Sequence, residues 1–222
     1  EQISLSAWKY EPVVHTCWET MFDAVRYAQS SCPSRPGIQH RLNLEKDAAV
    51  ATDGHRLVRV PTKDIPEGVY IRNKGEKVAR IIETDKFPCT KQILGDLYQE
   101  EKCLKHGWLV DITVLVSQLK FIQCRDKDLR FGSVVLQAQA DQLFVIIEQR
   151  DKYVVGNYIG DNEEKIFEEK FALNARYLEE ALNHCTGDYA LISVAEEFTG
   201  VGHPIQVLGQ NGHFCLIMPM RL

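Results

Sequence analysis

The feature that most constrains the fold of this chain is a change in the spacing of its apolar residues. Three segments carry them at the spacing of an amphipathic helix: residues 16–30, residues 111–124, and a segment from Asn174 to before Gly187. Thr16 followed by Glu19 fits a capping box, and Asp111 is placed to cap the second segment. The predicted helical stripes are Trp18, Phe22, Val25 and Ala28; Ile112, Leu115, Val116, Leu119 and Ile122; and Tyr177, Leu178, Ala181 and Leu182.

Between the helices the apolar period falls to two, as in strands with one buried face. Near the end of the chain, Asn211-Gly212 separates two apolar runs, which is a strong hairpin signal because both residue types accept positive φ. The fold class is therefore α+β, with hairpin-rich antiparallel sheets and few helices. The alternating positions are Val134, Leu136 and Ala138; Leu143, Val145 and Ile147; Tyr189, Leu191 and Ser193 opposite Ala190, Ile192 and Val194; Ile205 and Val207; and Phe214, Leu216 and Met218.

A polar, charged stretch over residues 95–106 lies between two units that each open with a helix followed by strands. We interpret it as a linker, which divides the chain into domains at residues 1–100 and 101–222. The repeat is architectural only, since the halves share no obvious residue pattern.

Composition excludes several classes of protein. The 222 residues contain 26 Lys+Arg and 31 Asp+Glu, a formal net charge of -5, which argues against a wholly basic nucleic-acid binder. No apolar run approaches a membrane span, and no secretory signal is visible. The seven cysteines form no C-x-x-C pair. We expect a reduced, cytoplasmic protein without metal or cofactor.

Four short segments carry the functional inference. Residues 51–57 are Ala-Thr-Asp-Gly-His-Arg-Leu, Phe87-Pro88 closes the first unit, Asn174 and Tyr177 open the third helix, and residues 216–222 are Leu-Ile-Met-Pro-Met-Arg-Leu. In this order they resemble the bacterial DNA polymerase III β sliding clamp family, whose middle domain carries Ala-Thr-Asp-Gly-His-Arg-Leu and whose last domain ends Met-Pro-Met-Arg-Leu. The resemblance covers residues 38–57, 85–94 and, more loosely, 111–222.

The resemblance implies two clamp-like domains and a groove between them that accepts a short extended peptide, typically with a Gln followed by Leu and Phe. The implied partners are the DNA polymerase, the clamp loader and repair proteins. Gln92, Gly202 and Pro204 depart from the family, so the preferred peptide is expected to differ. The matched groove positions are Ile38, Thr52, Gly54, His55, Arg56, Leu57, Pro88, Ile93, Phe131, Asn174, Tyr177, Leu216, Ile217, Met218, Pro219, Met220, Arg221 and Leu222.

Within that set, Ile38, Thr52, Leu57, Ile93, Leu216, Ile217 and Met218 would supply an apolar floor. His55, Arg56, Asn174, Tyr177 and Arg221 would bind polar atoms of the peptide at the rim.

Each motif also has a plainer interpretation. Asp53-Gly54-His55 is either half of a catalytic triad or a turn between strands, and no nucleophile motif supports the triad. His213 and Cys215 alternate on a strand, as metal ligands or as a hairpin His and a buried Cys. Tyr177 either contacts a peptide or packs internally.

DNA contact is the least specific expectation. The resemblance suggests helices that line a central hole around double-stranded DNA, with the loop over residues 31–37 touching the duplex. Arg26, Arg35 and Lys120 are the candidate contacts. Sparse basic residues of this kind also occur on an ordinary solvated surface.

The first domain is expected to be shortened, because residues 61–86 leave no room for the family's second helix and carry no helical stripe. Arg125 and Asp126 stand where the family's subunit contact tends to be apolar, which disfavours the standard hydrophobic interface. Two hypotheses follow: a working clamp that closes as a homo-oligomeric ring, or a monomeric clamp-derived module, encoded by a bacterium or a mobile element, that recruits or sequesters clamp-binding proteins. Nothing in the sequence points to an enzyme.

Overall fold

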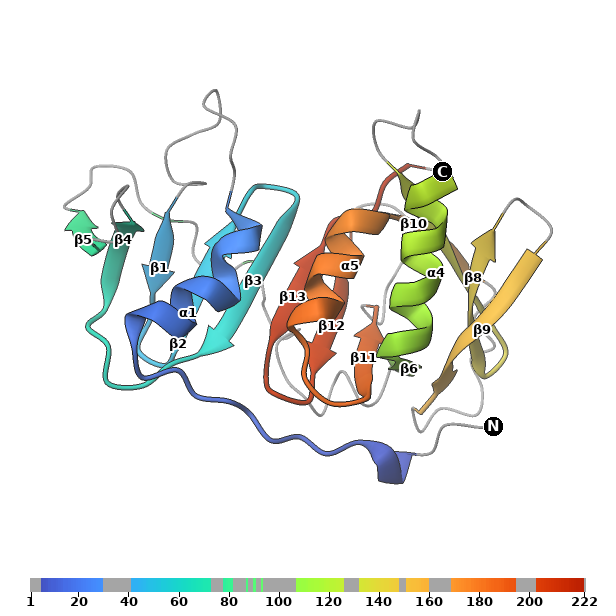
Figure 1. Ribbon diagram of the computed structural model, residues 1–222, viewed down its shortest axis with the longest axis horizontal. Coiled ribbons are helices and arrows are strands. Elements are labelled where there is room, and N and C mark those ends of the chain that lie inside the picture. Colours follow the sequence, from blue (N-terminus) through green and yellow to red (C-terminus); the bar gives the residue numbers. More distant parts are fainter. Residues whose placement is uncertain are drawn as a thin grey trace.

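The computed structural model describes residues 5–29, 41–72, 78–81, 87, 90, 93, 107–125, 132–147, 151–159, 169–194 and 203–221. In this part of the chain a 13-stranded antiparallel sheet carries the helices on one face (Figure 1). The strand order is β10-β7-β8-β9-β6-β11-β12-β13-β3-β2-β1-β4-β5. The helices are η1 (Leu5–Ala7), α1 (Trp18–Val25), η2 (Arg26–Ala28), α4 (Ile112–Arg125) and α5 (Ala175–His184). The strands are β1 (Leu42–Leu44), β2 (Ala48–Thr52), β3 (Arg56–Pro61), β4 (Gly68–Arg72), β5 (Val78–Ile81), β6 (Gly107–Asp111), β7 (Ser133–Gln139), β8 (Gln142–Ile147), β9 (Asp151–Tyr158), β10 (Glu169–Asn174), β11 (Tyr189–Ser193), β12 (Ile205–Gly209) and β13 (Phe214–Ile217).

The first predicted helix exists but begins later than expected. The capping box was wrong, because the residue before the helix is Cys17 and no side chain caps the first turn. His15 instead donates its backbone N–H to Pro61 at 2.9 Å and accepts from Lys63 at 3.0 Å, which holds the preceding chain extended. The helix buries Met21, Phe22 and Val25 and then tightens into η2.

The other two helices follow their prediction closely. Asp111 caps α4, since its Oδ1 accepts the backbone N–H of Val114 at 2.9 Å. On the buried stripe of α4, Leu115 and Leu119 are fully covered. On α5, Leu178 and Leu182 are equally buried, so both helices form the core on the helix side of the sheet.

Strand alternation is confirmed in β7, β8 and β11, and residues 42–52 form a hairpin. Leu136 and Leu143 are fully buried toward the helices, while Leu191 points to the opposite face from Ile192. In this hairpin β1 pairs antiparallel with β2, and the Glu45 N–H donates to the Ala48 carbonyl at 2.8 Å.

The Asn211-Gly212 hairpin is also confirmed, with a different turn. β12 and β13 pair antiparallel, and Gly212 takes the positive φ of 76°. Asn211 does not take positive φ; its side chain donates instead to the His184 carbonyl at 3.0 Å. The turn spans residues 210–213, and the N–H of Gly209 closes it on the carbonyl of His213 at 2.8 Å.

The halves of the chain meet where β13 pairs with β3, and we call this pairing the seam. Ile217 lies opposite Arg56 at one end of the seam, and Phe214 lies opposite Arg59 at the other. The seam makes the sheet continuous across both halves. The expected linker at residues 95–106 lies outside the described residues, so the division near residue 100 stays a prediction.

The N-terminal segment, residues 5–15, begins with η1 and then runs extended along the lower edge of both halves in Figure 1, and we call it the N-terminal strap. The backbone N–H groups of Glu11 and Val13 donate to Gln210 and Asn211 at 2.8 Å each. Trp8 and Tyr10 of the strap pack against a second apolar cluster on the face away from the helices. The cluster comprises Val50, Leu57, Leu109, Leu191, Leu208, Phe214 and Leu216.

The shortened first unit is confirmed within the described residues. Of residues 61–86, the described part forms β4 and β5 and contains no α-helix. Among the described helices, none has the length and hydropathy needed to cross a membrane.

Candidate functional site

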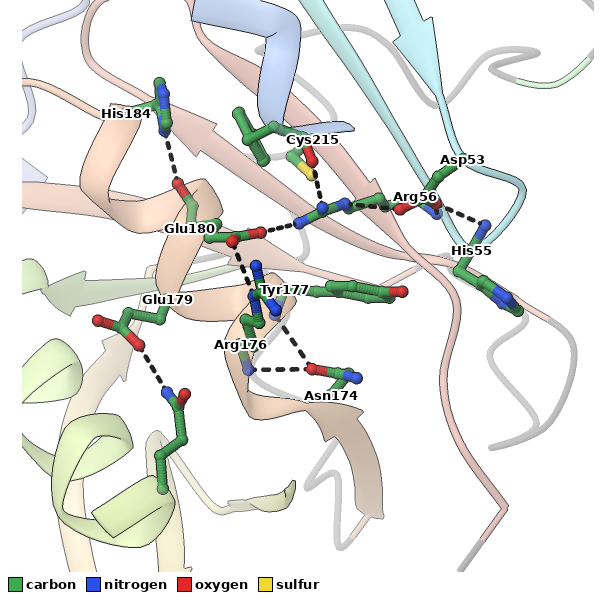
Figure 2. A network of polar contacts seen from close by, with 12 residues as sticks. Asp53, His55, Arg56, Asn174, Arg176, Tyr177, Glu179, Glu180, His184 and Cys215 are labelled. Atoms are coloured by element: carbon green, nitrogen blue, oxygen red, sulfur yellow. Dashed lines mark hydrogen bonds and ion pairs between the residues drawn. The ribbon is translucent and has the colours of Figure 1, made fainter. Parts of the chain in front are cut away.

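Three of the four sequence motifs converge at one end of the seam. After β13 the chain passes the β2–β3 turn, where the N–H of Met218 donates to the His55 carbonyl at 2.9 Å. Two residues later the N–H of Met220 donates to the Ala172 carbonyl at 2.8 Å, just before α5. The His55 and Tyr177 rings stack at a centroid distance of 6.4 Å. We call the surface formed by His55, Tyr177 and Met218 the junction site (Figure 2 shows His55 and Tyr177).

The β2–β3 turn is held by its own polar side chains. The Asp53 Oδ1 accepts the backbone N–H groups of His55 at 2.9 Å and Arg56 at 3.0 Å. The Thr52 hydroxyl donates to the Arg56 carbonyl at 2.6 Å, and Gly54 takes a φ of 88° that favours glycine. The turn interpretation of Asp53-Gly54-His55 is therefore confirmed, because the Asp53 carboxylate is committed to this loop.

Arg56 lies in the interior, where the sequence suggested a rim. It is 7% exposed, and its Nε donates to the Asp53 Oδ2 at 3.0 Å. Its other nitrogens donate to the Glu180 carboxylate and to the Tyr27 carbonyl. The guanidinium also stacks on the rings of Tyr27 and Tyr177, at 5.0 and 4.2 Å from the centroids. Arg56 therefore ties together the β2–β3 turn, η2 and α5 (Figure 2).

The charges in this network stabilise one another. Burial acts to raise the pKa of the Glu180 carboxyl, but hydrogen bonds from Arg56 and Arg176 outweigh it and hold that pKa below its usual value. Burial likewise acts to lower the pKa of Arg56, and the bond to Glu180 and the charge of Asp53 raise it overall. Glu180 and Arg56 are therefore both ionised at neutral pH.

The start of α5 positions the aromatic part of the site. Asn174 is the N-cap: its Oδ1 accepts the backbone N–H groups of Arg176 at 3.0 Å and Tyr177 at 3.2 Å. Tyr177 is half-buried, and burial, followed by the charge of Asp53, raises the pKa of its phenol. The Asn174 side chain, which was expected to bind polar atoms of a peptide at the rim, therefore caps α5 through its oxygen. The ring of Tyr177 faces His55.

The predicted apolar floor divides between core and surface. Leu57, Leu216 and Ile217 are 4%, 3% and 0% exposed, so they lie beneath the surface rather than on it. Met218 is 42% exposed and Ile93 is 41% exposed. Thr52, Pro219, Met220 and the departing Pro204 are half-buried, while Gly54, His55 and Arg221 are exposed. The predicted residues Ile38, Arg35, Pro88, Phe131 and Leu222, and the departures Gln92 and Gly202, lie outside the described residues.

A buried aromatic cluster lies beside Arg56, and the sequence did not predict it. Tyr27 stacks on His184 and His213 at centroid distances of 4.3 and 5.8 Å, and its hydroxyl bonds the His213 Nε2 at 2.7 Å. Burial, followed by the charges of His184 and His15, lowers the pKa of His213 to about 3. Burial raises the pKa of Cys215 to about 12. His213 and Cys215 are thus a buried hairpin His and a buried Cys, and the described residues contain no group of three potential metal ligands.

The predicted DNA contacts lie on the helix layer in a mixed environment. Arg26 and Lys120 are exposed, on η2 and α4. Glu19 and Asp23 are exposed on α1, next to Arg26 in sequence. The side chain of Arg125 and all of Asp126 lie outside the described residues. The described helix face therefore carries both charge signs.

A separate hollow of about 630 Å³ opens under the N-terminal strap. Its walls come from the strap, the α5–β11 turn and Gln210, and they contain none of the motif residues. The hollow is therefore distinct from the junction site.

Comparison with known proteins places the fold. No family model and no curated protein sequence matches the chain. Solved structures match most of the chain. A C. crescentus β sliding clamp with polyethylene glycol bound has 18% sequence identity and a TM-score of 0.65, and the match covers 91% of this chain and 63% of that one. A Borrelia burgdorferi DNA polymerase III β subunit in complex with a natural product has 20% identity and a TM-score of 0.65, and the match covers 90% of this chain and 60% of that one. A third is the Thermotoga maritima DNA polymerase III β subunit, with 15% identity, a TM-score of 0.62, and coverage of 91% of this chain and 62% of that one. The chain spans less than two thirds of the length of these proteins. The resemblance predicted from the four motifs is confirmed at the level of structure, and the chain has the fold of the DNA polymerase III β sliding clamps.

Proposed function

We propose that this protein is a non-enzymatic, sliding-clamp-like replication factor that binds short peptide motifs of polymerases and related proteins at the junction site. The observation that carries the proposal is the placement of Met218. On a clamp fold, the backbone of the segment after β13 is bound to the β2–β3 turn, and Met218 remains 42% exposed beside His55 and Tyr177. Such a role places the protein in the cytoplasm.

The chemistry of the junction site suits an extended peptide. Met218 is flexible and polarizable, so it adapts to apolar side chains of different shape. Gly54 is exposed in the adjoining turn and has no side chain, which allows a peptide backbone to approach closely. Arg56 and the capped α5 hold the turn and Tyr177 in place, and a preorganised site loses less entropy on binding.

A peptide-binding assay tests the proposal. We expect a Gln-x-x-Leu-Phe peptide to bind at micromolar strength, roughly −8 kcal/mol, by fluorescence anisotropy. Deletion of residues 218–222 should abolish binding, and Met218→Ser should weaken it about tenfold through loss of an apolar anchor. The matched control is Val114→Ser on α4, since Val114 is 40% exposed and lies in another part of the fold. Equal affinity for wild type and the Met218 variant would contradict the site.

The second candidate is a clamp-derived module that binds such peptides without encircling DNA. The mixed charge of the described helix face favours it, because sequence-independent DNA binding relies on neutralising many phosphates with Lys and Arg. Sedimentation at tens of micromolar separates the two. A stable monomer supports the module, whereas a closed oligomer retained on circular but not linear DNA supports a working ring.

A further inference from the structure

The N-terminal strap is attached to one half of the chain and docked on the other. It runs directly into α1, in the half that carries β1 to β5, yet it bonds to the β12–β13 turn of the other half (Figure 1). The N–H groups of Glu11 and Val13 donate to the carbonyls of Gln210 and Asn211 at 2.8 Å each. The Gln210 side chain donates in return to the Lys9 carbonyl at 3.1 Å. The strap is therefore bound by the second half while it is tethered to the first.

The surface under the strap fits an extended segment of this sequence. Trp8 and Tyr10 are half-buried and pack against the second apolar cluster, whereas Lys9 between them is exposed. Five of the seven buried members of that cluster lie on β6, β11, β12 and β13. Pro12 lies over Gly212, where an added Cβ would come within 2.9 Å of the Pro12 Cβ. Most of the surface that holds the strap thus belongs to the second half.

The connection between the strap and the first half is short and exposed. Val14, which is 46% exposed, is the single residue between Val13, which donates to Asn211, and His15, which donates to Pro61. The two residues after His15 are exposed, and the first turn of α1 has no side-chain cap. A short hinge favours exchange of the tethered element between copies, because one chain can close on itself in only a narrow range of geometries.

We propose that the N-terminal strap is exchanged between two copies of this chain, so that the strap of each copy docks on the β12–β13 turn of the other. The exchange keeps the contacts that the strap makes before the hinge, because the second copy offers an identical surface. The occupant is a second copy because the segment that fits this surface is the strap's own Trp-x-Tyr-x-Pro sequence. The inference is independent of the junction site, since a chain that binds no peptide can still exchange its strap.

Hinge length tests the exchange in the full chain, by light scattering from about 10 to about 1000 micromolar protein. We expect wild type to shift from monomer toward dimer over this range, which ends near the millimolar effective concentration of a short tether. Deletion of Val14 shortens the hinge by about 3.3 Å, so one chain cannot keep both the Asn211 and the Pro61 bonds. The dimer of this variant should therefore form at about tenfold lower concentration. Insertion of Gly-Ser-Gly after Val14 relaxes the hinge and should raise that concentration about tenfold.

Two further measurements identify the strap as the exchanged element. In the dimer of the deletion variant, the amides of Glu11 and Val13 should stay protected from hydrogen exchange, because they are bonded to the partner's turn; a strap that is only released loses this protection. In the same background, Trp8→Ala should return the chain to monomer by removing a half-buried anchor. Tyr153→Ser is the matched control and should keep the dimer, since Tyr153 is a 44% exposed aromatic residue on β9, outside the strap.

Three results would overturn the inference. One is a dimer that survives Trp8→Ala and is lost with Tyr153→Ser, because the copies would then meet through another surface. Another is a deletion variant that stays monomeric with unprotected Glu11 and Val13 amides. The third is equal association of wild type and the insertion variant. Thermal unfolding checks that each variant retains its fold, and the insertion, which removes no residue, decides the question if the deletion variant does not fold.

Discussion

The two ends of the seam are built from the same two strands and finish differently. At the Arg59–Phe214 end, the β12–β13 turn is covered by the N-terminal strap, and a side chain at Gly212 would meet the Pro12 Cβ at 2.9 Å and the Pro61 Cγ at 3.1 Å. At the Arg56–Ile217 end, the strap is absent from the described contacts, and Met218 stays 42% exposed.

The two ends of the seam differ in whether apolar side chains remain exposed. At the strap end, backbone hydrogen bonds and proline contacts cover the β12–β13 turn, and the hollow described above opens under the strap. The junction end is held from beneath by Arg56, which leaves the apolar and aromatic groups above it accessible. At this end a buried ionic network holds the β2–β3 turn in place, and the side chain of Met218 remains exposed.

Arg56→Met should have the largest effect. It leaves the Asp53 and Glu180 carboxylates without their shared partner, and loss of one member of a buried pair costs about 3–5 kcal/mol. Urea unfolding measures this. Arg59→Met on the same strand is the control: its ion pair is with Asp47, whose side chain is 75% exposed, so we expect about 1 kcal/mol. Equal losses at the two positions would erase the contrast between the ends of the seam.

Acid should destabilise the protein through His213. Its pKa is about 3 when folded and about 6.5 when unfolded, so between these values the unfolded chain binds an extra proton and stability falls as pH falls. From pH 6.5 to 5 the expected loss is about 2 kcal/mol. Urea unfolding of His213→Gln at several pH values should show a shallower slope. An unchanged slope in the His213 variant would refute the assignment.

Gly187→Ala should loosen the strap end. Gly187 has a φ of 91°, and an added Cβ would come within 2.0 Å of the Gln210 Oε1. Gln210 donates to the Lys9 carbonyl of the strap at 3.1 Å, so its displacement weakens that contact. We expect a loss of about 1–2 kcal/mol and faster amide exchange at Glu11 and Val13. Gly132→Ala, where the nearest atom is 4.0 Å away, should be close to neutral, and a similar loss there would contradict the mechanism.

Asn174→Ala should have the smallest effect on stability, because it removes one helix cap. The expected cost is about 1 kcal/mol by thermal or urea unfolding. Asn183→Ala, at an exposed position within the same helix, should cost less or stabilise slightly. If the two variants are equal, the Asn174 side chain does not cap α5 in solution.

Local signals predicted much of this molecule. The stripes of α4 and α5, the alternation of β7, β8 and β11, and the hairpin at Gly212 all depend on residues close in sequence. The segments of the junction site could be found in the sequence because they are recognisable family motifs, and the structure adds that the seam pairs Leu57 with Leu216.

The features that the sequence did not predict depend on contacts between residues that are far apart in the sequence. Thr16 has the sequence of a cap, yet the pairing of His15 with Pro61 and Lys63 delays the helix. Alternation shows that Leu57 and Leu216 share a face, but not that Trp8 and Tyr10 pack against the same cluster. Tyr27 carries no sequence signal, because its contacts with Arg56, His184 and His213 join residues that are far apart in the sequence.

The opposite placement of the two chain ends sets how this protein is best handled. Ala7 accepts a bond from Gln210 at the strap end, while Arg221 follows Met220 beside the junction site. An affinity tag or biosensor linkage placed before Leu5 would leave the proposed binding face toward solution. The same attachment close to Arg221 would lie near the proposed face and compete with any incoming ligand.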